Sequence, residues 1–298
     1  MNLKKLLIDF LEYLEIERNV SQLTIRNYKH YLERFLGFLG GQSPSPSEIT
    51  VEKIREYRLF LSRYVDPKGI SLKRITQNYH LIALRSFLKF LIKRGIRVVA
   101  PETIELGKAE SRSIKFLERE QVERLLNQPE TARDKAILET LFSTGLRVSE
   151  LVKLNRDQIN LDRREFGVIG KGRRARVVFL SETAVEWIKK YMEKRDDTYK
   201  PLFIRYSGKN PTENDESRRL SARSVQRLVE KYVKKARLPI KITPHGLRHS
   251  FATDLLSGGA DLRAIQELLG HKNVSTTQIY THITNPQLKE IHQKFHRR

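Results

Sequence analysis

The sequence predicts a mainly α-helical protein with one small antiparallel β-sheet. Apolar residues recur three and four positions apart through most of the chain, which is the spacing of one face of a helix. Only residues 158–180 change to the alternation of two that is typical of half-buried strands. Glycine and proline are few, at 15 and 10 among 298 residues, which favours a mostly helical protein over a low-complexity one.

The first hundred residues predict four helices separated by turn residues. Ser21 and Thr50 are suitable N-caps for the second and the third helix. Gly40 and Gly95 are suitable ends for the second and the fourth. The expected helices lie near 6–14, 22–39, 51–65 and 71–94. The fourth is expected to bury an apolar stripe of Ile75, Tyr79, Ile82, Leu84 and Phe87.

The remainder of the chain predicts a second domain. Residues 98–113 lack a sustained period and carry Pro, Gly and Ser, as an interdomain linker does. The expected limits are 1–105 for the first domain, 106–113 for the linker and 114–298 for the second domain. Helices are expected near 118–127 and 131–144, after Ser181, after Ser221, over 246–257 and 261–269, and in the tail. Between them, "QINLDRREFGVIGKGRRARVVFL" predicts three short antiparallel strands.

The charge of the chain points to a polyanionic partner. Lys and Arg total 57 against 35 acidic residues, a formal charge of +22, so nucleic acid is the leading candidate. A protein that is merely basic remains the alternative. The absence of cysteine excludes disulfides, thiolate catalysis and Cys-ligated metal sites. No apolar run reaches the roughly 20 residues of a spanning helix, so no membrane segment is expected. We expect the protein to be cytoplasmic.

The stretch "STGLRVSEL" predicts a fixed cation. Gly145 ends one helix, Arg147 opens the next, and Glu150 lies one turn beyond Arg147 on the same face. A guanidinium held by a carboxylate is a rigid fork for phosphate. By itself, the stretch favours an ordinary ion pair between residues three apart.

The stretch "GKGRRARVVF" places Lys171 between two glycines in a tight turn between strands. A lysine at such a tip can approach a bound backbone and donate a proton. The pattern of a Walker loop is absent, and a solvated turn is the alternative for this stretch alone.

A third stretch, "TPHGLRHSFATDLL", predicts an anion site at a helix start. Thr243 and Pro244 are helix-start residues, and His245 and Arg248 follow near the N-terminus, where the helix dipole favours anions. His249 is expected to point elsewhere. A zinc site built on His245 and His249 is rejected, because no Cys or carboxylate cluster completes a ligand set.

Near the end of the chain, "GHKNVSTTQIYTH" places Tyr280 among cationic, imidazole and hydroxyl side chains. A buried tyrosine needs only a hydrogen-bond partner, whereas an exposed one in such surroundings can attack a phosphate. The stretch alone does not decide between the two.

The order of these motifs is more specific than any one of them. With "GADLRAIQELLGH" added, the chain resembles the tyrosine recombinases (the phage-integrase family), and its Xer-type branch most. The resemblance covers 114–298 and, more loosely, the helical N-terminal half, which is similar to the family's SAM-like core-binding domain. It implies a C-terminal α+β catalytic domain.

The resemblance also implies the active-site residues. The matching positions are Arg147, Lys171, His245, Arg248 and His271, with Tyr280 as nucleophile and Glu150 in support. Arginines at the phosphate would stabilise the charge that develops as the tyrosine oxygen attacks. The implied chemistry needs no metal ion or other cofactor.

The partners that the resemblance implies are a double-stranded DNA recombination site and further copies of the chain. Family members form tetramers on DNA by donating a C-terminal helix to a neighbouring protomer. In this chain the buried face of that helix would be Leu288, Ile291 and Phe295. Docking of the helix on its own chain is the alternative. The DNA-binding candidates are Arg74, Arg85, Lys89, Arg223, Arg227 and Lys231. The role implied is chromosome dimer resolution, through a 3′-phosphotyrosyl intermediate and a Holliday junction. A mobile-element recombinase, a type IB topoisomerase and a DNA-binding protein without catalysis are the alternatives.

Overall fold

The computed structural model describes residues 2–40, 44–108, 115–170, 175–206 and 215–270. The chain divides into two compact units, Met1–Arg112 and Ser113–Arg298. The described residues are mostly helical and include one two-stranded sheet, which confirms the predicted fold class. Among the described helices, none combines the length and the apolar composition that crossing a membrane requires.

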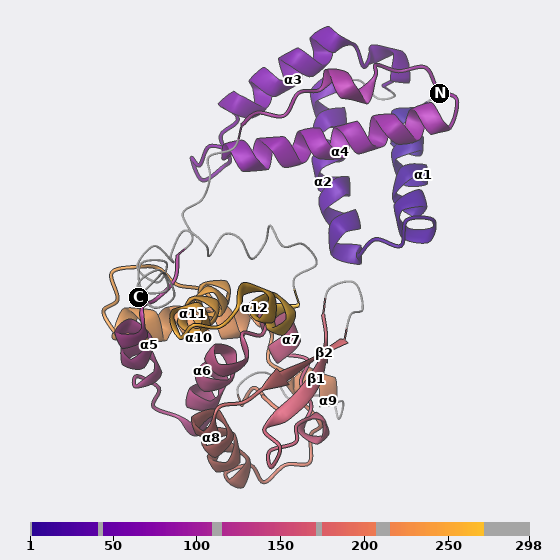
Figure 1. Cartoon of the computed structure of the whole chain (residues 1–298). Helices are drawn as coiled ribbons and strands as arrows, with labels where there is room; N and C mark the ends of the chain where they lie inside the picture. Colours follow the sequence, from indigo (N-terminus) through magenta and orange to yellow (C-terminus); the bar gives the residue numbers. More distant parts are fainter. Residues whose placement is uncertain (1, 41–43, 109–114, 171–174, 207–214, 271–298) are drawn as a thin grey trace, which may run out of the picture. The chain divides into compact units, whose positions relative to one another are not determined.

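The N-terminal unit contains the four predicted helices. They are α1 (Leu3–Ile16), α2 (Gln22–Leu39), α3 (Val51–Arg63) and α4 (Arg74–Lys93), with short 3₁₀ turns at Pro46–Glu48 and Pro101–Thr103. The Ser21 hydroxyl accepts from the backbone N of Thr24 at 3.3 Å, and the Thr50 hydroxyl accepts from that of Lys53 at 3.1 Å. Both predicted N-caps therefore start their helices. Helix α4 crosses α1 and α2 and packs against both (Figure 1).

Aromatic rings fill much of the core of this unit. The rings of Phe10 and Phe87 lie 5.3 Å apart, and those of Phe35 and Tyr57 lie 4.9 Å apart, all four side chains being buried.

The predicted apolar stripe of α4 is partly wrong. Tyr79 is 47% exposed and Ile82 is 38% exposed. The helix instead buries a neighbouring face that includes Asn78, Leu81 and Leu88. Asn78 belongs to that face because its side chain exchanges two hydrogen bonds with the backbone of Gly107, at 2.7 and 3.2 Å.

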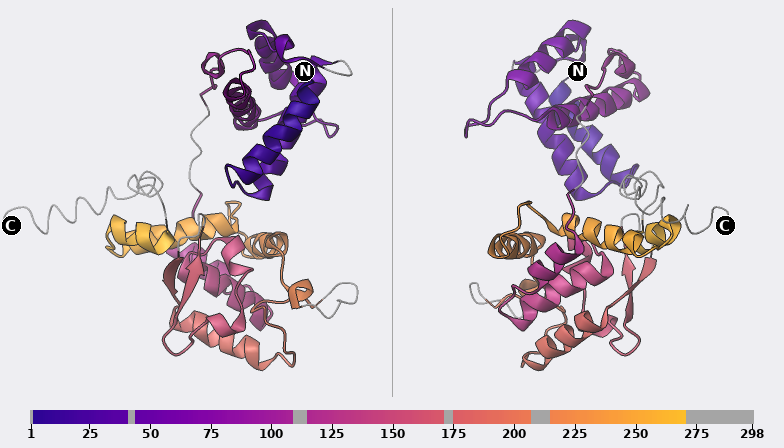
Figure 2. Two further views of the ribbon diagram at one scale, coloured as in Figure 1. Left: turned by 90° about the vertical axis from the view of Figure 1, so that its right-hand side faces the viewer. Right: turned by 60° about the vertical axis from the view of Figure 1, so that its left-hand side comes forward.

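The C-terminal unit is built around α6 (Ala132–Thr144). This helix is buried along most of its length and packs against α5 (Arg119–Leu126), α8 (Glu182–Glu193), α10 (Ala222–Lys235) and α11 (Pro244–Ser257). Shorter elements lie in the segments that connect the longer helices and the strands of this unit: α7 (Val148–Leu151), the 3₁₀ turn Arg156–Gln158 and α9 (Asp215–Arg218). Helix α12 (Leu262–Leu269) follows α11, and the two run along one side of the unit (Figure 2).

The sheet consists of β1 (Glu165–Ile169) and β2 (Ala175–Phe179), which are antiparallel. Phe166, Val168 and Val178 face the core. The prediction of three strands is wrong, because Asn160 makes only an isolated bridge to Glu165. The residues just before it form the 3₁₀ turn, so no ladder develops there.

Helix ends in the C-terminal unit are fixed by glycine and by side-chain caps. Gly145 ends α6 in the left-handed conformation at φ +58°, and Gly270 ends α12 in the same way at φ +61°. Thr243 caps α11 with its hydroxyl, and Pro244 occupies the first turn. These ends lie at the positions where the sequence places the candidate catalytic residues.

We expect Gly145→Ala to lower the free energy of unfolding more than the matched variant Gly259→Ala. Both glycines have positive φ, which alone costs an L-residue about 1–2 kcal/mol. An added Cβ at Gly145 would overlap the ring of Phe251 and lie 3.1 Å from Cδ2 of Leu269, whereas at Gly259 it would meet nothing within 4 Å. Overpacking should therefore add about 1–3 kcal/mol at Gly145, measured by urea unfolding. Equal losses of unfolding free energy in the two variants would show that the ring of Phe251 moves aside without an energetic cost.

Candidate active site

A buried carboxylate, Glu150, lies at the centre of the candidate site. Its side chain is 6% exposed. Arg147 donates from its backbone N to Oε2 and from Nη1 to Oε1, both at 2.9 Å. Arg176 adds a fork, from Nη1 to Oε1 at 3.1 Å and from Nη2 to Oε2 at 2.8 Å. Burial acts to raise the pKa of Glu150, but the bonds from Arg176 and Arg147 outweigh it and lower the pKa to about 2.

Arg147 stands at the N-cap position of α7, directly after the left-handed turn at Gly145. The three-residue spacing to Glu150 brings the guanidinium onto the carboxylate, so its direction is fixed. The Arg147 side chain is nevertheless 31% exposed. A fixed guanidinium that still reaches solvent is suited to bind an anion.

Arg248 comes from α11, far along the chain, and reaches the same turn. Its Nη1 donates to the carbonyl of Gly145 at 2.6 Å, and its Nη2 donates to the carbonyl of Leu269 at the end of α12. The residue is 2% exposed. Since Gly145 lies two residues before Arg147, these bonds bring the segments of both arginines together.

His245 lies one turn before Arg248 and keeps an exposed surface. The pKa of His245 lies below its ordinary value, because the surrounding protein disfavours the charged ring and because Arg248 and Arg147 are both near it. The imidazole is therefore neutral near pH 7 and can accept a proton.

The expectation that His249 points elsewhere is wrong. The rings of His245 and His249 meet edge to face, with centroids 4.4 Å apart, because residues four apart share a helix face. Burial, with the charges of His245 and Arg248, lowers the pKa of His249 to about 4.

Three predicted residues lie outside the described part of the chain: Lys171, His271 and Tyr280. The same holds for the predicted helix-exchange residues Leu288, Ile291 and Phe295. What the structure brings together is Arg147, Glu150, His245 and Arg248. The described chain resumes four residues after Lys171, at the start of β2, and it stops at Gly270, immediately before His271.

Sequence reasoning missed Arg176. This residue lies on β2 opposite Val168, and its side chain is 9% exposed. The signal was present in the alternation of "ARVVF", where Arg176 shares the inward face with Val178. In so basic a chain, however, one more arginine looks like another surface charge.

The DNA-binding candidates lie on two helices, one in each unit. On α4, Arg74 and Lys89 are exposed and Arg85 is half-buried; on α10, Arg223, Arg227 and Lys231 are all exposed. Lys89 lies 3.6 Å from Glu102, and Lys231 lies 3.6 Å from Glu130. Exposed pairs of this kind contribute little and are screened by salt, so these lysines remain accessible to another anion.

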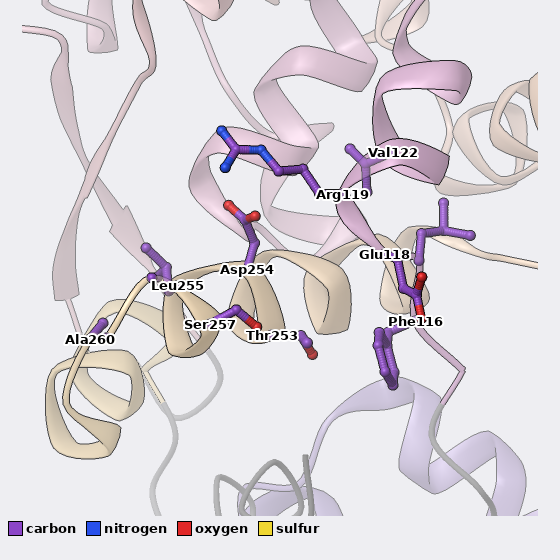
Figure 3. A pocket seen from close by; sticks show the side chains of 12 residues that line it. Phe116, Glu118, Arg119, Val122, Thr253, Asp254, Leu255, Ser257 and Ala260 are labelled. Atoms are coloured by element: carbon purple, nitrogen blue, oxygen red, sulfur yellow. The ribbon is translucent and has the colours of Figure 1, made fainter. Parts of the chain in front are cut away.

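The C-terminal unit also has a groove of about 770 Å³ between the start of α5 and the end of α11. Phe116 and Glu118 come from the α5 side, and Asp254, Leu255 and Ser257 come from α11 (Figure 3). None of its lining residues belongs to the candidate catalytic set. The candidate site is thus a cluster of charged groups at helix ends rather than this groove.

The candidate site as a whole is positively charged. Among the described residues, the guanidiniums of Arg147 and Arg176 share the carboxylate of Glu150, and that of Arg248 binds the Gly145 carbonyl two residues before Arg147. An excess of preorganised cations is suited to bind a phosphate and to stabilise extra charge on it during reaction. A neutral imidazole beside them can serve as a base.

Comparison with known protein families and proteins shows which proteins this chain is similar to. A model described as the phage integrase family matches residues 115–286, and one described as the phage integrase N-terminal SAM-like domain matches residues 7–95. Tyrosine recombinase XerC of Pelotomaculum thermopropionicum is 37% identical over 313 residues, covering 97% of this chain and 97% of the relative. Tyrosine recombinase XerC of Bacillus subtilis is 37% identical over 311 residues, covering 100% and 98%.

Among solved structures, the fold is similar to XerH site-specific recombinase bound to palindromic difH substrate in a post-cleavage complex. The TM-score is 0.70 and the identity 25%, covering 92% of this chain and 80% of that chain.

We expect Glu150→Gln to destabilise the protein by about 3 kcal/mol at pH 7, because Arg147 and Arg176 would then face each other without a neutralising charge. The pKa of Glu150 is depressed to about 2 from an ordinary 4.5, so its contribution is complete above pH 4.5 and is lost as pH falls toward 2. Urea unfolding of both proteins at pH 7, 4 and 3 should show the difference shrinking. A difference that is constant with pH would contradict the charged pairing.

Proposed function

The chain belongs to the phage integrase family, and we propose that it catalyses site-specific strand exchange in DNA as a tyrosine recombinase of the Xer type. The observation that carries the proposal is the convergence of Arg147 and Arg248, from distant segments, on the turn at Gly145. The similarity to XerC proteins, which extends over nearly the whole chain, supports it. The relative XerH is described as bound to its DNA substrate.

In the proposed reaction, the Tyr280 oxygen attacks a DNA phosphodiester. A bond forms between that oxygen and phosphorus, and the bond from phosphorus to the 5′ oxygen breaks. Arg147 and Arg248 bind the two non-bridging oxygens, on which negative charge grows in the transition state. The buried Glu150 supports this role by fixing the guanidinium of Arg147.

The protons move through the remaining residues of the proposed site. His245 takes the phenolic proton, in agreement with its lowered pKa, and Lys171 protonates the departing 5′ oxygen. His271 donates a hydrogen bond to the phosphoryl group. The product is a 3′-phosphotyrosyl link and a free 5′ hydroxyl. Because the link retains the bond energy, a 5′ hydroxyl of a second duplex can reverse the step, and two such exchanges make and resolve a Holliday junction.

The two domains have different proposed tasks. Residues 1–105 form a core-binding domain that holds DNA, 106–113 a linker, and 114–298 the catalytic domain. Exposed cations on α4 and α10 supply the contacts, chiefly to phosphates. Chromosomal DNA as substrate implies the cytoplasm as location.

Strand exchange between two duplexes requires four active protomers. We place their contacts in the C-terminal helix, with Leu288, Ile291 and Phe295 buried in a neighbour, because a head-to-tail contact of this kind can close into a ring. The host process that fits an Xer-type recombinase is resolution of chromosome dimers; integration or excision of a mobile element is the alternative.

We expect Tyr280→Phe to abolish covalent capture of DNA while changing duplex affinity by no more than about twofold, since only the nucleophilic oxygen is removed. A nicked suicide substrate carrying a site selected from random DNA measures the capture. Tyr206→Phe, which alters a tyrosine that is 59% exposed, serves as the control and should cleave normally.

A covalent complex formed by the Tyr280→Phe variant would refute the assignment of Tyr280 as the nucleophile. Plasmid relaxation by the wild-type protein without exchange between two sites would favour the topoisomerase alternative. Binding without any cleavage would favour the alternative of a DNA-binding protein.

We expect the double variant Arg223→Ala, Arg227→Ala to flatten the salt dependence of DNA binding. If the wild-type protein neutralises about eight phosphates, log K falls with log salt at a slope of about −7, and loss of two contacts makes the slope less steep by about 2. The control Lys189→Ala, Lys190→Ala removes two charges from α8 and should leave the slope unchanged. Equal slopes for all three proteins would remove α10 from the DNA interface.

A further inference from the structure

We infer that Arg176 is a positioning residue for DNA cleavage, which acts by holding Glu150 and the end of α12 and thereby keeps the charge of Arg147 available to phosphate. The inference rests on the proposed function. It gives Arg176 a role that requires no contact with the reacting atoms.

The three nitrogens of the Arg176 guanidinium are all engaged. Two of them form the fork on the Glu150 carboxylate, at 3.1 and 2.8 Å, and Nε donates to the carbonyl of Leu268 at 3.0 Å. Since the side chain is 9% exposed, these bonds lie largely away from water. Lysine has a single nitrogen at its tip and cannot reproduce the arrangement.

Through these bonds Arg176 connects three elements that meet in this part of the unit: α7, β2 and α12 (Figure 1). Arg248 binds the carbonyl of Leu269 while Arg176 binds that of Leu268, so two guanidiniums hold consecutive carbonyls at the negative end of the α12 dipole. The next residue, Gly270, fits closely here: an added Cβ would lie 3.0 Å from Cδ of Arg176. Arg176 thus fixes the point from which the chain continues toward His271 and Tyr280.

The net charge of the cluster distinguishes a positioning role for Arg176 from a purely structural one. With two guanidiniums on one carboxylate, the cluster of Arg147, Arg176 and Glu150 carries a net positive charge. Without Arg176, Glu150 and Arg147 would form a neutral pair, and the attraction of Arg147 for a phosphate would fall. Loss of Arg176 should therefore slow the reaction even in protein that remains folded.

The test compares Arg176→Met with Arg219→Met. Arg219 is similarly engaged but binds a different carboxylate: it is 14% exposed, and it forks onto Glu216 at 2.8 and 2.6 Å. It also donates to the carbonyls of Val152, at the C-cap of α7, and Leu154, at 2.9 and 3.1 Å. Both variants lose a largely buried guanidinium that joins a carboxylate to backbone. Only Arg176 shares its carboxylate, Glu150, with Arg147.

The readouts are the single-turnover rate of phosphotyrosyl formation on a nicked suicide substrate, the DNA dissociation constant and the unfolding temperature. For Arg176→Met we expect a rate lower by about 100-fold at saturating DNA, as for a misplaced catalytic group, with affinity nearly unchanged. Arg219→Met should lose stability but retain its rate below its unfolding temperature. Arg176→Lys, which keeps a charge, should cleave at an intermediate rate and guards against failure of the methionine variant to fold.

A double-mutant cycle tests whether Arg176 acts through Glu150. In a Glu150→Gln background, adding Arg176→Met should slow cleavage by about tenfold or less, because the pair is already broken. A full 100-fold loss in that background overturns the inference, as does an unchanged rate in the single variant or an equal loss in Arg219→Met. Wild-type protein that forms no covalent complex would instead overturn the proposed function, so the two failures are separable.

Discussion

The candidate site depends on one buried carboxylate placed among guanidiniums. Glu150 is nearly removed from water, and a charge in that position is tolerated only because Arg147 and Arg176 neutralise and hydrogen-bond it. The same bonds fix the direction of each arginine. A turn between two helices and a strand of the small sheet therefore cannot move independently. The geometry that would bind phosphate is thus a consequence of the need to satisfy one carboxylate.

A second constraint comes from the ends of helices. Carbonyls at a helix C-terminus lack partners within the helix, and Arg248 satisfies two such ends at once, at Gly145 after α6 and at Leu269 in α12. Each of these helices ends at a glycine in the left-handed conformation, which allows the backbone to turn sharply. At Gly145, the missing side chain also leaves room for the ring of Phe251. Buried arginines replace the polar contacts that water would otherwise supply. They also bring residues far apart in the sequence to one place.

Sequence patterns predicted the helices well, because caps such as Ser21, Thr50 and Thr243 and the spacing of apolar residues act locally. The ion pair of Arg147 and Glu150 was predictable for the same reason. Arg176 was not, because its partners come from elements distant in the sequence and only burial separates it from the other basic residues. The third strand was wrongly predicted, since alternation cannot tell a ladder from a single bridge. The prediction of the face that α4 buries was partly wrong because that face includes polar residues, Asn78 and His80, and Asn78 is buried to bind the backbone of Gly107.

Excess positive charge links the stability of the site to its affinity for anions. The guanidiniums of Arg147 and Arg176 share the carboxylate of Glu150 and repel each other. Backbone carbonyls bind Arg176 and the neighbouring Arg248 at Leu268, Leu269 and Gly145. A second carboxylate would relieve that repulsion and would also compete with the phosphate that we propose the site binds. The unrelieved repulsion therefore favours an anionic ligand, whose binding stabilises the folded state by linkage. In the role that we propose, the site is therefore most stable when it holds the DNA backbone, because the phosphate charge relieves the repulsion between its guanidiniums.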